Sequence, residues 1–173
     1  MHEKKGLPLL MIYPVGVLGP GDPKATGRYI LDLIHGRVPA RVLEDHVFTF
    51  VHVRDVAEAI VRAAEKEGNI GEKYLVGKEQ LSWKEISQMI SDISGVALPK
   101  MRMPDFLTMF NARFLTLVAN LIKKPPLWNM AIDQIRTMKE GVQVDGSKVE
   151  RELAITYTPV RVALEEAIAS YRE

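Results

Sequence analysis

Hydrophobic positions in the first part of the chain form strand-like runs that alternate with helix-like stripes. Leu7–Tyr13 is continuously apolar, which is typical of a strand buried on both faces of a parallel sheet. Thr26–His35 repeats apolar residues on one helical face, and Gly36 after it predicts the end of the helix. Val47–Val53 is rich in β-branched and aromatic residues and predicts a second strand.

The alternation continues toward the middle of the chain. Asp55 is predicted to cap the next helix, because its carboxylate can accept a hydrogen bond from a free first-turn amide. Lys73–Val76 predicts a short strand. Ser82 and Glu85 have the spacing of a capping box, in which each side chain binds the other residue's backbone, so another helix is expected to begin there.

The last third of the chain is predicted to be nearly all helical. Pro104–Ile122 is apolar on more than one side, and both it and the following helix, Leu127–Lys139, are expected to be packed between other elements. Val142–Asp145 predicts a short edge strand and Ser147–Leu153 a short helix. Thr158–Pro159 is expected to open the last helix, with Thr158 as its cap. The pattern therefore predicts an α/β fold, in which the end of a parallel sheet carries a mostly helical cap.

Composition narrows the possible functions. A chain of 173 residues fits one domain, since domains usually have roughly 100–200 residues. The net charge is +1 with scattered Lys and Arg, which favours neither nucleic acid nor an anionic membrane as a partner. The absence of Cys excludes disulfides and thiolate chemistry. The N-terminal apolar run is too short to span a membrane and has no cleavage site, so we expect a cytoplasmic protein.

The glycine-rich segment Gly16–Gly21 follows a predicted strand and must be tested as a dinucleotide-binding loop. Its spacing is G-x-x-G-x-G, whereas the fingerprint is G-x-G-x-x-G or G-x-x-G-x-x-G followed at once by a helix. Pro20 and Pro23 also remove amides that would hold a pyrophosphate. We therefore interpret the segment as a turn.

Two further motifs have structural explanations. Tyr74 and Lys78 match Tyr-x-x-x-Lys in letters, but on a strand the two side chains would be about 13 Å apart, at about 3.3 Å per residue. His52 lies in a predicted strand and is interpreted as a hydrogen-bonded structural histidine. The histidines lack metal-ligand spacing, so no metal site is predicted. No Gly-x-Ser-x-Gly elbow indicates a hydrolase.

Five segments in register resemble the extended short-chain dehydrogenases/reductases, and the resemblance covers residues 3–172. They are GLPLLMIYPVGVLGPGD (6–22), FVHVRDVAEAI (50–60), GEKYLVG (71–77), LSWKEI (81–86) and DGSKVERELAITYTPVRVALEEAIASYR (145–172). Within that family the chain most resembles the dihydroflavonol-4-reductase-like branch of the NAD-dependent epimerase/dehydratase group. Phe48 occupies the position where sugar-nucleotide epimerases usually have an Arg for the diphosphate, which indicates a less charged carbonyl substrate.

The resemblance implies a Rossmann-like parallel sheet and an incomplete active site. In the family, the glycine fingerprint, the catalytic Ser or Thr and the Tyr-x-x-x-Lys helix precede the strand at Leu7. Pro14, Val15 and Gly16 would contact the nicotinamide of NAD or NADP. Phe48, Met101 and Met103 would bind substrate, although the methionines could equally fill a core. No catalytic residue is assigned to this chain, and no tight binding of a cofactor is expected from it alone.

Two functions remain open. The chain could be the C-terminal, substrate-binding half of an NAD(P)-dependent oxidoreductase or epimerase, with residues 1–173 as one segment. Alternatively, it could be a non-catalytic binding or assembly module derived from the same fold. An apolar strand with an open edge tends to pair with another chain, so we expect either a homo-oligomer or a missing N-terminal half as partner. Marginal stability is also expected, because one face of the sheet would lack its cover.

Overall fold

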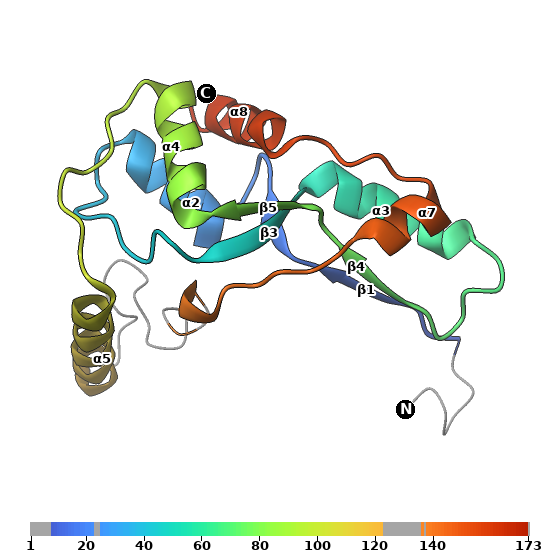
Figure 1. The fold of residues 1–173 in the computed structure, drawn as a ribbon, viewed down its shortest axis with the longest axis horizontal. Helices are drawn as coiled ribbons and strands as arrows, with labels where there is room; N and C mark the ends of the chain where they lie inside the picture. Colours follow the sequence, from blue (N-terminus) through green and yellow to red (C-terminus); the bar gives the residue numbers. More distant parts are fainter. Residues whose placement is uncertain (1–7, 23–24, 123–135, 137, 173) are drawn as a thin grey trace. The chain divides into compact units, whose positions relative to one another are not determined.

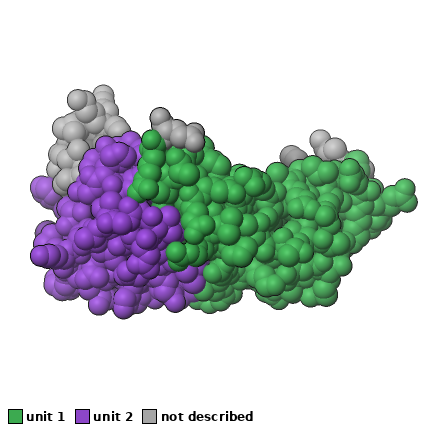
Figure 2. Space-filling model, turned by 90° about the horizontal axis from the view of Figure 1, so that it is seen from above, with its two compact units in different colours: residues 1–22, 49–80, 143–173 green, residues 23–48, 81–142 purple. Residues whose placement is uncertain are grey.

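The protein is described from a computed structural model that covers residues 8–22, 25–122, 136 and 138–172. Its contacts divide the chain into two compact units, shown in Figure 2. Unit 1 contains residues 1–22, 49–80 and 143–173, and unit 2 contains residues 23–48 and 81–142. Each unit therefore joins segments that are distant in the sequence.

The described strands form two small sheets (Figure 1). Strand β1 (Met11–Pro14) pairs in parallel with β4 (Lys73–Val76). Strand β2 (Gly16–Leu18) pairs in parallel with β3 (Val47–His52), and β5 (Glu79–Ser82) completes the order β2-β3-β5. Only one residue separates β1 from β2. The backbone therefore pairs with β4 up to Pro14 and with β3 from Gly16 onward.

Helices α3 (Val53–Glu65) and α7 (Ser147–Leu153) pack on the β1–β4 pair, as Figure 1 shows. Alternate residues of a strand point to opposite faces, so only one set of side chains from these strands can enter this core. Helix α8 (Val160–Ser170) contacts β2 instead. The buried cluster consists of Val51, Ala59, Ala63, Tyr74, Val76, Val149, Leu153 and Ile155, with Leu10 and Ile12 packed against it.

The prediction that Leu7–Tyr13 is buried on both faces was wrong. The strand covers Met11–Pro14, and the side chains of Leu9 and Tyr13 are exposed, while Leu7 lies outside the described residues. The physical reason is that α3 and α7 cover one face of the β1–β4 pair, and the described part of the chain supplies no helix for the other.

Unit 2 contains helices α2 (Ala25–Ile34), α4 (Trp83–Ser94) and α5 (Asp105–Ile122). Helices α2 and α4 are in contact, with Ile30, Leu33, Ile86 and Ile90 fully buried. The predicted capping box at α4 is confirmed: the Glu85 amide donates to Ser82 Oγ at 3.2 Å, and the Ser82 amide donates to Glu85 Oε2 at 2.7 Å.

Three expectations for the C-terminal half need revision or fall outside the structure. Helix α5 was expected to be packed on several sides, but Phe106 and Phe110 are largely exposed among the described residues. Val142–Asp145 is not a strand; Val142 forms a single bridge to Phe48. The predicted helix Leu127–Lys139 lies mostly outside the described residues. No helix in the described ranges is long and apolar enough to cross a membrane.

Ser82→Ala is expected to lower the free energy of unfolding by about 1 kcal/mol, because a first-turn amide of α4 loses its acceptor. Hydrogen bonds from the Ser82 hydroxyl and amide also lower the pKa of Glu85. A lowered folded-state pKa stabilises the fold above the unfolded pKa and ceases to do so as the pH falls through the folded pKa. The difference in the free energy of unfolding between the variant and the wild type should therefore become smaller in acid. Urea unfolding at two pH values would measure it.

The exposed Lys84, in the same turn, provides the control. Lys84→Ala should change the free energy of unfolding by less than about 0.5 kcal/mol. Equal losses in the two variants would show that the Ser82 cap has no specific role.

Candidate functional site

The segment Pro14–Gly16 lies at the carboxyl end of β1, where open α/β sheets bind their ligands. Pro14 is exposed, and Val15 and Gly16 are half-buried. The Val15 amide donates to the carbonyl oxygen of Val76 at 3.3 Å, so the sheet already uses this donor. A ligand at this end of the strand would therefore meet the ring of Pro14.

Close approach of the backbone explains the glycines around this segment. A Cβ on Gly16 would lie 2.7 Å from Cδ1 of Phe50, and a Cβ on Gly77 would lie 2.3 Å from Cγ2 of Val15. The interpretation of Gly16–Gly21 as a turn was thus wrong for its first half, since Gly16–Leu18 forms β2. Gly16 permits tight pairing with β3, and the backbone turns only from Gly19, where φ is +148°.

Tyr157 links the loop after β4 to the residue before α7 through its hydroxyl. Its hydroxyl accepts a hydrogen bond from the Gly77 amide at 3.2 Å and donates to the carbonyl oxygen of Gly146 at 3.3 Å. Burial raises the pKa of the Tyr157 phenol. Both partners of the Tyr157 hydroxyl are backbone groups, which it links, so we interpret Tyr157 as a structural residue.

Tyr74 and Lys78 do not form a catalytic pair. Tyr74 is fully buried on β4, and its hydroxyl donates to Glu152 Oε2 at 3.1 Å. Lys78 lies beyond the strand and forms an ion pair with Glu150 at 2.6 Å. Hydrogen bonds from Lys66 and Tyr74 lower the pKa of Glu152. Tyr74 and Lys78 therefore match the Tyr-x-x-x-Lys motif in sequence only, as their position on and after a strand predicted.

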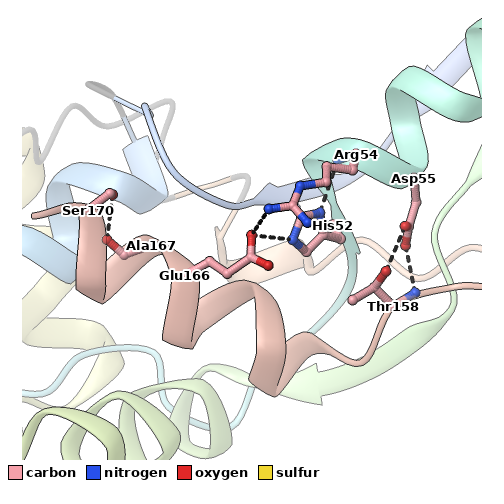
Figure 3. Close-up of polar contacts among 7 residues, drawn as sticks. All are labelled: His52, Arg54, Asp55, Thr158, Glu166, Ala167 and Ser170. Atoms are coloured by element: carbon pink, nitrogen blue, oxygen red, sulfur yellow. Dashed lines mark hydrogen bonds and ion pairs between the residues drawn. The ribbon is translucent and has the colours of Figure 1, made fainter.

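Asp55 and Thr158 bind each other rather than capping their own helices (Figure 3). The Asp55 carboxylate accepts from the Thr158 amide at 2.7 Å and from its hydroxyl at 2.8 Å, and Asp55 is only 3% exposed. Both predicted caps were therefore wrong. The first turn of α3 is capped by His52, and the Val160 amide at the start of α8 donates to Glu79 Oε2 at 2.9 Å.

His52 is 1% exposed, and both of its ring nitrogens have partners. Nδ1 accepts from the Arg54 amide at 3.0 Å, so the ring proton belongs on Nε2, which lies 3.2 Å from Glu166 Oε2. Arg54 also donates to this carboxylate, at 2.7 Å (Figure 3). The contacts agree with the prediction of a hydrogen-bonded structural histidine, which here links the end of β3 to α8.

The predicted substrate residue Phe48 belongs to an aromatic cluster of unit 2. Its ring packs edge-on against Trp83 at a centroid distance of 6.0 Å, and Trp83 in turn meets Tyr29 at 4.8 Å. The Tyr29 hydroxyl lies 2.8 Å from Ser87 Oγ, and burial raises the pKa of the Tyr29 phenol. Phe48 therefore lies in apolar surroundings and is half-buried.

Met101 and Met103 flank a parallel bridge between Arg41 and Arg102. The Arg41 amide donates to the Met101 carbonyl oxygen, and the Met103 amide donates to that of Arg41, both at 2.9 Å. Met101 is 57% exposed and Met103 is half-buried. These methionines are thus placed by their backbones, which leaves the Met101 side chain available for contact.

The buried carboxylate of Glu44 lies between the guanidinium groups of Arg41 and Arg102 and balances their charge. The sequence did not reveal this group. Glu44 is 4% exposed and lies 3.3 Å from Arg41 and 3.2 Å from Arg102, while Asp45 also binds Arg102. Leu43, immediately before it, has a positive φ of 51°, which is unusual for a residue other than glycine. No local signal could have revealed the group, because Arg102 comes 58 residues after Glu44.

The described residues contain no cluster of metal ligands.

Part of the chain is similar to a family of known proteins. Residues 1–77 match the model of the NAD dependent epimerase/dehydratase family. The matched residues include Pro14–Gly16 and Phe48, whereas Met101 and Met103 lie beyond them. The chain is 32% identical to sterol demethylase protein B of Methylococcus capsulatus, over all of this chain and 52% of that protein. It is 26% identical to a Synechocystis protein provisionally named dihydroflavonol 4-reductase, over 95% of the chain and 48% of the relative.

The chain thus spans about half the length of the curated relatives it matches. The crystal structure of gox2253 is similar over 99% of this chain and 51% of that chain, with a TM-score of 0.76 and 31% identity. Two structures share the fold alone. RMD from Pseudomonas aeruginosa, complexed with NADPH, has a TM-score of 0.62 and 15% identity over 98% of this chain and 49% of its own. UDP-glucuronic acid 4-epimerase from Bacillus cereus, in complex with NAD, has a TM-score of 0.68 and 20% identity over 99% and 47%.

Asp55→Ala is expected to lower the free energy of unfolding by about 3 kcal/mol, because the Thr158 amide and hydroxyl both lose a charged acceptor in a buried position. Urea unfolding followed by circular dichroism measures the loss. Asp92→Ala is the matched control: Asp92 is exposed and accepts from Gln88 in the same helix, and its replacement should lower the free energy of unfolding by less than about 0.5 kcal/mol. A loss as small for Asp55 would contradict its structural role.

Proposed function

We propose that this chain is the C-terminal, substrate-side half of an NAD(P)-dependent oxidoreductase that acts on a carbonyl group of a weakly charged substrate. The observation that carries the proposal is that Pro14, in a segment matched by the family model, is exposed at the carboxyl end of the parallel strand β1. The bound nicotinamide would supply the chemistry of hydride transfer. The chain alone is inactive under this proposal.

The contacts around Pro14 define how the chain would take part in cofactor binding. The pyrrolidine ring is exposed and apolar, and the packing of Gly16 on Phe50 and of Gly77 on Val15 fixes its position. Such a surface suits the flat face of a nicotinamide ring. Because the Val15 amide already donates to the carbonyl oxygen of Val76, we assign it no hydrogen bond to the cofactor.

Charge supports a substrate without a diphosphate. The guanidinium groups of Arg41 and Arg102 face Glu44, and Asp45 takes a further donor from Arg102. Paired in this way, they offer little positive charge to an anionic substrate. Phe48 and Met101 are apolar, and the names of the relatives refer to a sterol and a dihydroflavonol. The favoured substrate is therefore a largely apolar molecule with a ring ketone or its alcohol.

The proton donor is proposed to lie on the half that this chain does not span. The tyrosines whose hydroxyls hold strand β4 and its end, Tyr74 and Tyr157, are structural, and His52 is buried with both nitrogens engaged. Under the proposal, Pro14 of unit 1 contacts the nicotinamide, and Phe48 and Met101 of unit 2 contact the substrate.

Cofactor titration tests the proposal. This chain is fused to the part of the Methylococcus capsulatus relative that it does not match, and calorimetry measures binding of NADPH and NADH. We expect micromolar binding by the fusion and none up to about 1 mM by the chain alone, since enzymes of this kind work at about 1 μM to 1 mM ligand. Pro14→Glu should weaken binding by the fusion at least about tenfold, because a bulky anion then occupies the floor of the site.

Pro8→Glu serves as the matched control, because Pro8 is also an exposed proline but precedes the amino end of the same strand. It should leave the dissociation constant unchanged. A folded fusion that binds neither cofactor would contradict the proposal and favour a non-catalytic binding module. Saturable micromolar binding by the chain alone would overturn the claim that its site is incomplete.

A further inference from the structure

Helix α5 (olive in Figure 1) exposes a stripe of large apolar side chains. Phe106, Phe110, Phe114 and Leu117 follow one another at spacings of three or four residues, so they lie on one face of the helix. Each of these residues is 60% to 76% exposed. A contiguous apolar patch on a protein surface usually marks a site of contact, so the stripe needs a partner.

The other side of α5 is held by unit 2. Thr108 is fully buried, and Met109 packs against the buried Leu43. At the start of the helix, Asp105 Oδ2 lies 3.3 Å from His46 Nε2. These contacts fix the inner side of the helix, so α5 can offer only its exposed stripe to a partner.

Basic residues are concentrated around the stripe. Residues 100–124 include five basic side chains and one acidic one, which gives this segment a net charge of +4; the whole chain has +1, so the remaining residues carry −3. Arg102 is paired with acidic neighbours, whereas Lys100 and Arg113 are exposed. Lys123 and Lys124 follow α5 in the sequence. The net charge of the whole chain, which favoured no anionic membrane as partner, conceals this concentration.

We propose that α5 binds the surface of an anionic lipid bilayer. The side chains of Phe106, Phe110, Phe114 and Leu117 enter the boundary between headgroups and acyl chains, as the apolar face of an interfacial amphipathic helix does. The basic residues beside the stripe contact lipid phosphates, and each of them adds to the attraction by an anionic surface. The proposal goes beyond the proposed function and does not rest on it.

Charge favours a lipid surface over a second copy of the chain. Two copies that met through α5 across a two-fold axis would bring the same surface, with the same basic residues, face to face. Their like charges would repel each other. An anionic bilayer instead offers opposite charge to Lys100 and Arg113 and an apolar layer to the phenylalanine rings. The stripe and its basic surroundings therefore fit one lipid surface better than a copy of themselves.

Vesicle flotation tests the proposal with the full chain. The vesicles contain phosphatidylcholine alone or phosphatidylcholine and phosphatidylserine at about 7:3. Binding should be at least about tenfold stronger to the anionic vesicles, and should weaken as added salt screens the charges. Phe110→Ser should weaken it at least about tenfold, because the inserted ring is lost. Arg113→Gln should weaken it about fivefold, and only on anionic vesicles.

Leu75→Ser and Lys84→Gln are the matched controls. Leu75 is an exposed apolar residue of unit 1, and Lys84 is an exposed basic residue of unit 2. Neither change should affect binding to vesicles. If Leu75→Ser weakens binding as much as Phe110→Ser does, the vesicles respond to any exposed apolar surface and the proposal is wrong. It is equally wrong if the wild-type chain binds neither kind of vesicle.

A single label locates the contact, because the chain has no Cys of its own. Phe114→Cys that carries an environment-sensitive fluorophore should shift its emission to the blue when anionic vesicles are added. Lys84→Cys with the same fluorophore should not shift. Equal shifts at the two positions would contradict insertion of the stripe.

Measurements without vesicles identify the other possible occupants of the stripe. Phe110→Ser should change neither the sedimentation coefficient nor the urea midpoint of the chain, because the Phe110 side chain is exposed in the free protein. A smaller sedimenting particle would assign the stripe to a second copy. A lower urea midpoint would assign it to another part of the same chain. Either result would overturn the proposal.

Discussion

The one-sided packing of α3 and α7 on the β1–β4 pair is the constraint on which the rest of unit 1 depends. Tyr74 and Val76 alternate into this core from β4, while Ile12 enters from β1, and their neighbours are left on the other face. Among the described residues, the β1–β4 pair is therefore covered by helices on one face, although a buried parallel sheet normally has helices on both faces. An apolar strand with a single covered face is the physical origin of both the exposed surface and the expected modest stability.

Local rules predicted the elements well, because their signals lie within a few residues of each other. The Ser82–Glu85 capping box and the strand at Lys73–Val76 were both confirmed. The same rules failed at Asp55 and Thr158, each of which has the composition of a helix cap. These residues are separated by 103 positions in the sequence, and in the folded chain they satisfy each other. A polar side chain at a helix start indicates a need for a hydrogen bond, but its partner is chosen by tertiary structure.

The candidate site shows the same division. Pro14, Val15 and Gly16 were assigned from the family resemblance; the structure shows that they lie where β1 ends and β2 begins, and their contact with a cofactor stays a prediction. The buried Glu44 between Arg41 and Arg102 could not be predicted, because nothing near Glu44 in the sequence marks Arg102 as its partner. The apolar run at Leu7–Tyr13 overlaps the parallel strand β1 only over Met11–Tyr13, and the double burial expected for it depends on a cover that the described chain does not provide.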